Sequence, residues 1–169
     1  EYYFAVRFPG PQWYLRSIAF VPATANGTPV DATRTWTTVK PGDQLSGLTF
    51  TLAQGASLVR GSVSLAEGQT VPEKLVAFLV PAERENAEEP LRYFAAPVNA
   101  EGNFWVHNVA PGRYWGVTRS ATENTRETWS KVRLPDGAEI RSSLRHDAQQ
   151  TKMEIEIKPC QEIKFQLPL

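Results

Sequence analysis

The sequence predicts an all-β fold: an antiparallel β-sandwich with an N-terminal β extension and one short helix near the C-terminus. Apolar and polar side chains alternate in several segments, which is the period of a strand with one buried face. The 13 prolines and 11 glycines fall largely between these segments and mark corners. Residues 99–117 combine both features, since two aromatic-rich segments there are joined by a Pro-Gly corner. We expect the other strands to gather around this pair.

The first third of the chain is expected to form strands. Leu48, Phe50 and Leu52 alternate with threonines, which is typical of a half-buried strand. The same reasoning predicts strands at residues 2–8, 13–21 and 34–39, the last of which contains Trp36.

A polar corner at residues 53–55 divides the chain. We expect residues 1–54 to be a β extension or the trailing part of a preceding module, and residues 55–169 to be the main sandwich. Because the chain opens inside a strand-like pattern, we expect it to be a mature fragment or a segment of a larger protein.

The main domain begins with an alternating strand over residues 59–65, in which we expect Gly61 to mark a bulge. Residues 75–80 contain no polar side chain, so we expect a central strand that is covered on both faces. The charged residues 82–90 predict a solvated loop with a helical turn, and residues 91–98 predict a returning strand.

The central pair of strands follows. Asn99 and Gly102 suit a turn, because both tolerate positive φ. Phe104 then opens a strand with two distinct faces. The corner Pro111-Gly112 suits a type II turn, after which Tyr114 begins a strand that we expect to run beside the first.

The C-terminal part is expected to contain one helix and two edge strands. Residues 137–149 predict a short amphipathic helix with Asp136 as its N-cap, buried through Ile140, Leu144 and Ala148. Alternation over residues 153–157 and 163–167 predicts two strands joined at Pro159-Cys160. Their charged outward side chains protect sheet edges against aggregation, although self-association through these edges remains a weaker hypothesis.

One set of positions resembles a known family: Asn99, Gly102, Phe104, Val106, Val109, Pro111, Gly112 and Tyr114, preceded by Val59, Gly61, Val63 and the apolar residues 75–79. The pattern is similar to that of the carboxypeptidase regulatory-like domain. The resemblance implies a prealbumin-like (transthyretin-like) sandwich. It also implies a mostly non-catalytic accessory role in large exported bacterial proteins, and hence an extracellular, periplasmic or cell-envelope location beside neighbouring domains.

Composition narrows the classes of partner. The 18 basic and 18 acidic residues give zero formal net charge, which argues against a nucleic-acid or anionic-membrane surface. No apolar run approaches the roughly 20 residues of a membrane-spanning helix. Cys160 is the only cysteine and cannot form an internal disulfide.

Residue types that often act in catalysis, histidine and cysteine above all, are few in this sequence, and we expect neither an enzyme nor a cofactor. His107 is expected on a sheet surface. Ser143 and His146 can meet on one helix face, but Asp147 points about a quarter turn away, so a catalytic triad is not supported. Metal-ligand spacings such as His-x-His are absent from the sequence. Enzymes on prealbumin-like folds, the hydroxyisourate hydrolases and intradiol dioxygenases, have motifs that find no counterpart here.

The main hypothesis is therefore a non-catalytic structural or interaction module. The alternative is a carbohydrate-binding module, in which exposed indoles stack on sugar rings. The candidates are Trp36, Trp105, Trp115 and Trp129, of which Trp105 and Trp115 are expected to be cross-strand neighbours. The competing interpretation places these two beneath the helix or the N-terminal strands. A cell-surface or polysaccharide ligand is the partner that this alternative implies.

Overall fold

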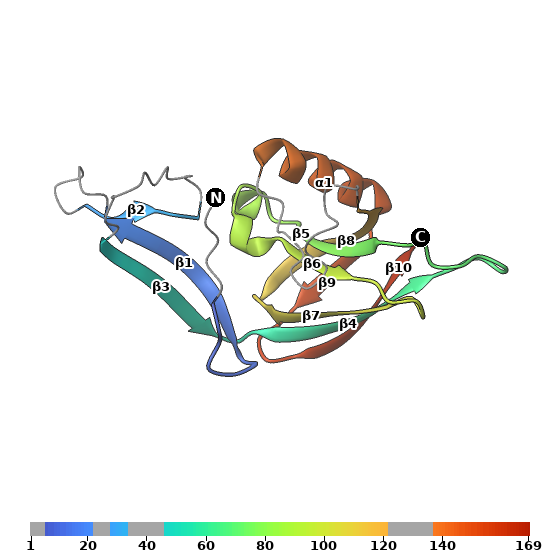
Figure 1. Cartoon of the computed structure of the whole chain (residues 1–169), viewed down its shortest axis with the longest axis horizontal. Coiled ribbons are helices and arrows are strands. Elements are labelled where there is room, and N and C mark those ends of the chain that lie inside the picture. The colour runs from blue at the N-terminus through green and yellow to red at the C-terminus, as the bar shows by residue number, and fades with distance from the viewer. Residues whose placement is uncertain (1–5, 22–27, 34–45, 122–136) are drawn as a thin grey trace.

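The computed structural model describes residues 6–21, 28–33, 46–121 and 137–169 (Figure 1). The strands are β1 Trp13–Val21, β2 Val30–Asp31, β3 Ser46–Gln54, β4 Ser57–Ser64, β5 Leu75–Pro81, β6 Phe94–Pro97, β7 Asn103–Val109, β8 Gly112–Ser120, β9 Glu154–Ile157 and β10 Glu162–Pro168. The helices are the 3-10 turns η1 Arg84–Asn86 and η2 Pro90–Arg92, and α1 Ala138–Thr151.

Two sheets form the sandwich, which confirms the predicted fold class. One sheet has the strand order β10-β4-β7 and the other has β6-β5-β8-β9. Their inner faces share one core, whose fully buried side chains include Val59, Leu79, Phe104, Tyr114 and Leu167. Alternation along the strands supplies this core, because every second side chain points between the sheets.

One strand pair departs from the predicted antiparallel arrangement. Strand β10 runs parallel to β4, with Glu162 opposite Leu58 and Pro168 opposite Ser64. The other pairs among the described strands are antiparallel. The corner at residues 158–161 carries the chain from β9 in one sheet to β10 in the other, and both strands lie at sheet edges as predicted.

The central stretch folds as two strands, but the prediction that they run side by side is wrong. Strand β7 pairs with β4, whereas β8 pairs with β5 and β9 in the opposite sheet. Phe104 and Tyr114 are each 1% exposed and both contribute to the core between the sheets. The Tyr114 hydroxyl donates to the carbonyl of Ala110 (2.8 Å), which fixes the corner between the two layers.

Gly61 marks close packing, and the predicted bulge there is wrong. Register is continuous from Arg60 through Ser62, and the irregularity in β4 lies between Ser57 and Val59. A Cβ atom on Gly61 would lie 1.9 Å from Cζ of Phe104. The missing side chain therefore makes room for the ring of its cross-strand partner.

Strand β5 is central and covered on both faces, as predicted. Leu75, Ala77 and Leu79 face the main core, whereas Phe78 and Val80 belong to a second cluster beneath α1. The predicted helical turn in the charged loop is present as η1. The predicted strand over residues 91–98 is shorter, because η2 precedes β6.

Helix α1 covers the outer face of the β6-β5-β8-β9 sheet through Leu144 and Ala148 (Figure 1). The prediction of Ile140 on the buried side is wrong: Ile140 is 53% exposed, and Arg141 is the buried residue of that turn. Positions 141, 144 and 148, which are three and four residues apart, also lie on one helix face, and Arg141 pairs with Glu88 (3.7 Å). Gly137 is the N-cap and makes no side-chain capping bond, while Asp136 lies outside the described residues.

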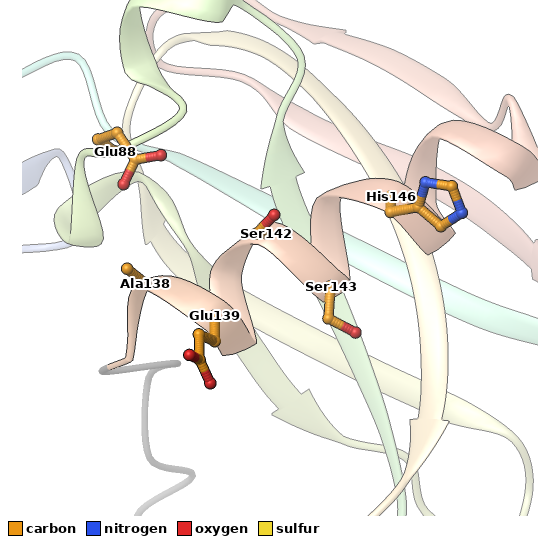
Figure 2. A pocket seen from close by; sticks show the side chains of 6 residues that line it. All are labelled: Glu88, Ala138, Glu139, Ser142, Ser143 and His146. Atoms are coloured by element: carbon orange, nitrogen blue, oxygen red, sulfur yellow. The ribbon is translucent and has the colours of Figure 1, made fainter.

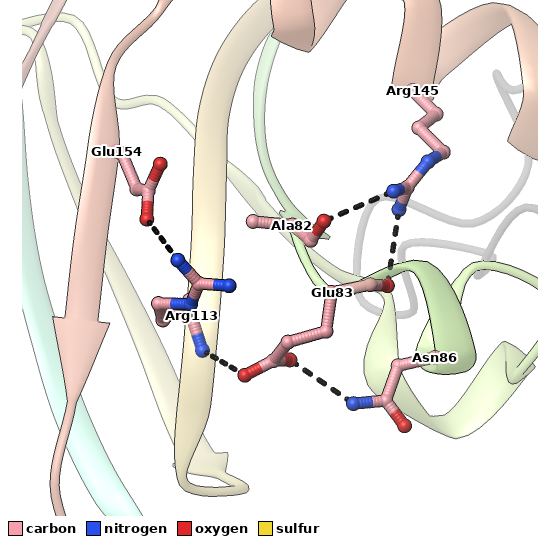
Figure 3. Close-up of polar contacts among 6 residues, drawn as sticks. All are labelled: Ala82, Glu83, Asn86, Arg113, Arg145 and Glu154. Carbon is pink, nitrogen blue, oxygen red and sulfur yellow. Dashed lines mark hydrogen bonds and ion pairs between the residues drawn. The ribbon is translucent and has the colours of Figure 1, made fainter.

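Polar contacts tie the helix and the charged loop to the strands (Figure 3). Arg145 donates to the backbone carbonyls of Pro81, Ala82 and Glu83. The Glu83 carboxylate accepts from the backbone N–H of Arg113 (2.9 Å) and from Nδ2 of Asn86 (3.0 Å). The end of β5, the start of β8 and α1 are thus held together at one end of the sandwich.

The N-terminal strands form a separate sheet, ordered β2-β1-β3. The predicted strands at residues 13–21 and 48–52 are confirmed as β1 and β3. Residues 6–8 have no strand, and residues 1–5 and 34–39 lie outside the described part of the chain. The backbone N–H groups of Gly55 and Ala56 both donate to the carbonyl of Gln12 (2.9 Å each), so this sheet is attached at the end of β3. The module boundary at residues 53–55 stays a prediction.

Candidate functional site

The two outer faces of the sandwich differ in what covers them. The face of the β6-β5-β8-β9 sheet is apolar at Phe78, Val80 and Val117 and lies under α1. The outer face of the β10-β4-β7 sheet has no such cover in the described structure, and its residues Arg60, Trp105 and Lys164 are exposed. We call this second surface the open face.

The open face consists of the outward side chains of three strands, and strand register aligns them in rows. One row contains Trp105 opposite Arg60 and Arg60 opposite Lys164. The next row contains Asn103 opposite Ser62 and Ser62 opposite Gln166. These six side chains line a shallow depression of about 490 Å³.

Trp105 is the aromatic member of the open face and is 44% exposed. Its neighbours on β7, Phe104 and Val106, point into the core, so alternation alone directs the indole outward. An indole of this exposure presents an apolar surface to solvent, against which a flat apolar ligand face can stack.

The charges of the open face are mixed, with a positive excess. Arg60 Nε pairs with Glu162 Oε1 at 2.7 Å, and both side chains are more than half exposed. Within the described part of the chain, no ion pair joins Lys164 to a carboxylate. Two cations therefore face one anion. Among the described residues, Arg60 uses only Nε in its ion pair, so its two terminal nitrogens can donate further hydrogen bonds.

Trp115 does not lie beside Trp105, so the expected cross-strand pair is wrong. Trp115 is on β8, between Val80 and Glu154, and is half-buried. The Arg145 guanidinium of α1 lies 5.0 Å from the centroid of its ring. The competing interpretation, that this tryptophan lies beneath the helix, therefore holds for Trp115 alone. Trp36 and Trp129 lie outside the described residues.

The serine, histidine and aspartate of α1 are not arranged as a catalytic triad. Arg119 of β8 holds both Ser143 Oγ (2.9 Å) and the Asp147 carboxylate. In Figure 2 the side chains of Ser143 and His146 do not point toward one another, and within the described helix no hydrogen bond joins them. They line an open depression of about 670 Å³ together with Glu88, Ala138, Glu139 and Ser142.

Other candidate reactive groups are His107, possible metal ligands and two buried tyrosines. His107 is exposed on β7, as expected. Within the described residues, no three His, Cys, Asp or Glu side chains are grouped closely enough to hold a metal ion. Burial raises the pKa of Tyr93, and burial raises the pKa of Tyr114 to about 12, so both phenols stay protonated at neutral pH.

Sequence reasoning identified Trp105 but missed the polar residues that share its face. Alternation over residues 163–167 predicts Lys164 and Gln166 as outward residues of an edge strand, and Arg60 lies between apolar positions of β4. These residues are brought together by the register between strands that are far apart in the chain. The alternation of apolar and polar residues does not reveal that register.

Comparison of the chain with protein-family models, with curated proteins and with solved structures finds no match. The resemblance to the carboxypeptidase regulatory-like domain therefore stays a prediction. None of the helices among the described residues has the length and apolar character needed to cross a membrane.

Proposed function

We propose that this chain is a non-catalytic structural and interaction module, whose rigid sandwich holds its surfaces and any neighbouring domains in fixed geometry. The observation that carries this proposal is the continuous core. Large side chains of both sheets, among them Leu79, Phe104 and Tyr114, are almost completely removed from solvent. Cores of this kind are packed as densely as organic crystals and deform little.

The sharpest test of the non-catalytic role targets α1, where a hydroxyl, an imidazole and a carboxylate (Ser143, His146 and Glu139) line one depression. The purified chain is assayed with ester and glycoside substrates beside Ser143→Ala and His146→Ala. Ser120→Ala is the control, because Ser120 is exposed at the end of β8 and does not line that depression. We expect no turnover by any of the four proteins. Turnover that disappears in the Ser143 and His146 variants but persists in the control contradicts the proposal.

A second candidate function is carbohydrate binding at the open face, which the exposure of Trp105 favours. Sugar rings have apolar faces that stack on an indole, and their hydroxyl groups need hydrogen-bonding partners close by. Asn103, Ser62 and Gln166 form a row of such groups beside Trp105. An uncovered sheet face also admits an extended chain, which an enclosed pocket does not.

Substitution of Trp105 tests this second function. Binding to a panel of polysaccharides, measured by affinity gel electrophoresis, is expected to disappear in Trp105→Ala and to survive in Trp105→Phe, which keeps an aromatic face. Ile140→Ala is the matched control, because Ile140 is similarly exposed (53% against 44% for Trp105) but lies on α1. Equal binding by wild type and Trp105→Ala, or no binding to any polysaccharide of the panel, rejects carbohydrate binding at this face.

The proposed setting is an exported bacterial protein, either extracellular or in the periplasm or cell envelope. Its support is the family-like pattern of residues 99–117. Fractionation of the source cells, with antibodies against this chain, is expected to recover it outside the cytoplasm. Recovery with cytoplasmic markers contradicts this location.

A further inference from the structure

We propose that the ligand of the open face is an acidic polysaccharide, one whose sugar rings carry carboxylates, with Lys164 and Arg60 as the groups that bind those carboxylates. This inference rests on the carbohydrate-binding function proposed above and adds the chemical class of the ligand. It follows from the charges beside Trp105 and from their spacing.

The first argument is the local charge. The whole chain has no formal net charge, yet the row that contains Trp105 continues with Arg60 and Lys164 and with no acidic residue. Glu162, the carboxylate on β10, is already paired with Arg60 Nε. An incoming carboxylate therefore meets a positive excess, whereas a neutral sugar leaves the Lys164 ammonium without an anionic partner.

The second argument is geometry. Neighbouring strands lie about 4.8 Å apart, so Lys164 stands two strand spacings, roughly 10 Å, across the sheet from Trp105. Arg60 lies between them, because it pairs with both residues in register. A sugar ring stacked on Trp105 thus leaves the adjacent ring of the same chain over Arg60 and Lys164. The terminal nitrogens of Arg60 can then donate two parallel hydrogen bonds to one carboxylate.

The second row supplies contacts to hydroxyl groups. Gln166 Nε2 donates to Ser64 Oγ at 3.3 Å, which orients the amide and leaves its oxygen as an acceptor. Asn103 and Ser62 add further donors and acceptors at the same level of the sheet. A polysaccharide chain that crosses the strands can therefore place hydroxyl groups along one row and carboxylates along the other.

The experiment compares two probes by isothermal titration calorimetry: oligogalacturonate and neutral cello-oligosaccharides of equal length, at low and at high salt. Wild type is expected to bind oligogalacturonate more tightly, with affinity that falls as salt screens the charges. Lys164→Gln is expected to weaken oligogalacturonate binding about two- to fivefold at low salt, the range of an exposed ion pair. Binding of the neutral probe should not change.

Two controls separate specific recognition from general attraction. Lys158→Gln removes the same charge from an exposed residue in the corner after β9 and is expected to bind as wild type. Trp105→Ala is expected to lose oligogalacturonate binding. If Lys158→Gln weakens binding as much as Lys164→Gln, or if Trp105→Ala binds normally, the attraction is diffuse and the proposal is overturned.

The outcomes also distinguish this inference from the function it rests on. Equal affinity for both probes, unaffected by Lys164→Gln, leaves carbohydrate binding in place and overturns the acidic class. Failure of both probes to bind, together with failure of the polysaccharide panel, removes carbohydrate binding itself and the inference with it.

Discussion

Substitution of Gly61 should destabilise the sandwich through one identifiable contact. An alanine Cβ at this position would lie 1.9 Å from Phe104 Cζ and 2.3 Å from Cε1 and Cε2, far inside van der Waals contact. Phe104 is 1% exposed and packed among both sheets, so its ring has no free space to enter. Overpacking of a filled core costs about 1–3 kcal/mol, and overlap with an aromatic ring places Gly61→Ala at or above the upper end. That is a large share of the roughly 5–15 kcal/mol that stabilises a domain.

A double-mutant cycle tests whether Phe104 is the cause. Phe104→Leu shortens the side chain and should by itself cost about 1–2 kcal/mol as a partial truncation. In Gly61→Ala/Phe104→Leu, the added methyl group enters space that the ring has vacated. The double variant should therefore be destabilised by at least about 1 kcal/mol less than the sum of the single variants.

Urea unfolding followed by far-UV circular dichroism measures all of these free energies. Gly137→Ala is the control, because a Cβ there meets Ile140 only at 3.6 Å, an ordinary contact. It should change stability by less than about 1 kcal/mol, the usual effect at a helix N-cap. If Gly61→Ala is as mild as Gly137→Ala, or if the two single effects simply add, the assignment of Gly61 to ring packing is wrong.

Three further predictions concern single contacts. The raised pKa of Tyr114 favours the neutral phenol in the folded state, so the contribution of Tyr114 to stability should be constant below about pH 10 and be lost, by up to about 3 kcal/mol, toward pH 12. Urea unfolding at a series of pH values should therefore find a smaller decline between about pH 10 and pH 12 in Tyr114→Phe than in wild type. Ser57→Ala leaves the Gln161 N–H without its acceptor (2.9 Å), and loss of this partly buried bond should cost about 0.5–1.5 kcal/mol by the same assay. An unchanged midpoint would show that the bond does not stabilise the fold. Arg145→Met removes the donors to the carbonyls after β5 and the contact with Trp115. Hydrogen exchange of the α1 amides should therefore become faster, while exchange of the β4 amides stays unchanged. Equal acceleration of exchange in α1 and β4 would mean global destabilisation.

Much of the sandwich follows from local pattern. Strand β5 was predictable as a central, covered strand because both of its faces are apolar, and β10 was predictable as an edge strand because Lys164 and Gln166 alternate with apolar residues. Two of the wrong predictions concern strand partners. The alternation that makes β7 and β8 strands says nothing about which sheet each joins, and both the parallel β10–β4 pair and the crossing at Pro111 depend on contacts between residues far apart in the chain.

The helix shows a second limit of local pattern. Helical spacing fits positions 140, 144 and 148 as well as 141, 144 and 148, and hydrophobicity favours Ile140. The structure buries Arg141 instead, because its stem can cover apolar surface while its guanidinium pairs with Glu88. The deciding interaction is tertiary, and so it could not be recognised from the helix sequence alone.

The same limit applies to the candidate site. A single exposed aromatic side chain is common on protein surfaces, so Trp105 by itself does not define a binding face. What distinguishes it is the register, which places Arg60 and then Lys164 in its row and a row of amide and hydroxyl groups alongside. On the opposite sheet, Trp115 has equally outward geometry, but it packs against an apolar cluster that includes Val80 and Val117, and α1 covers it. The polar side chains around Trp105 thus explain why no helix of the described residues covers this face, and they are the reason that the proposed ligand is a hydrated, charged polymer and not an apolar partner.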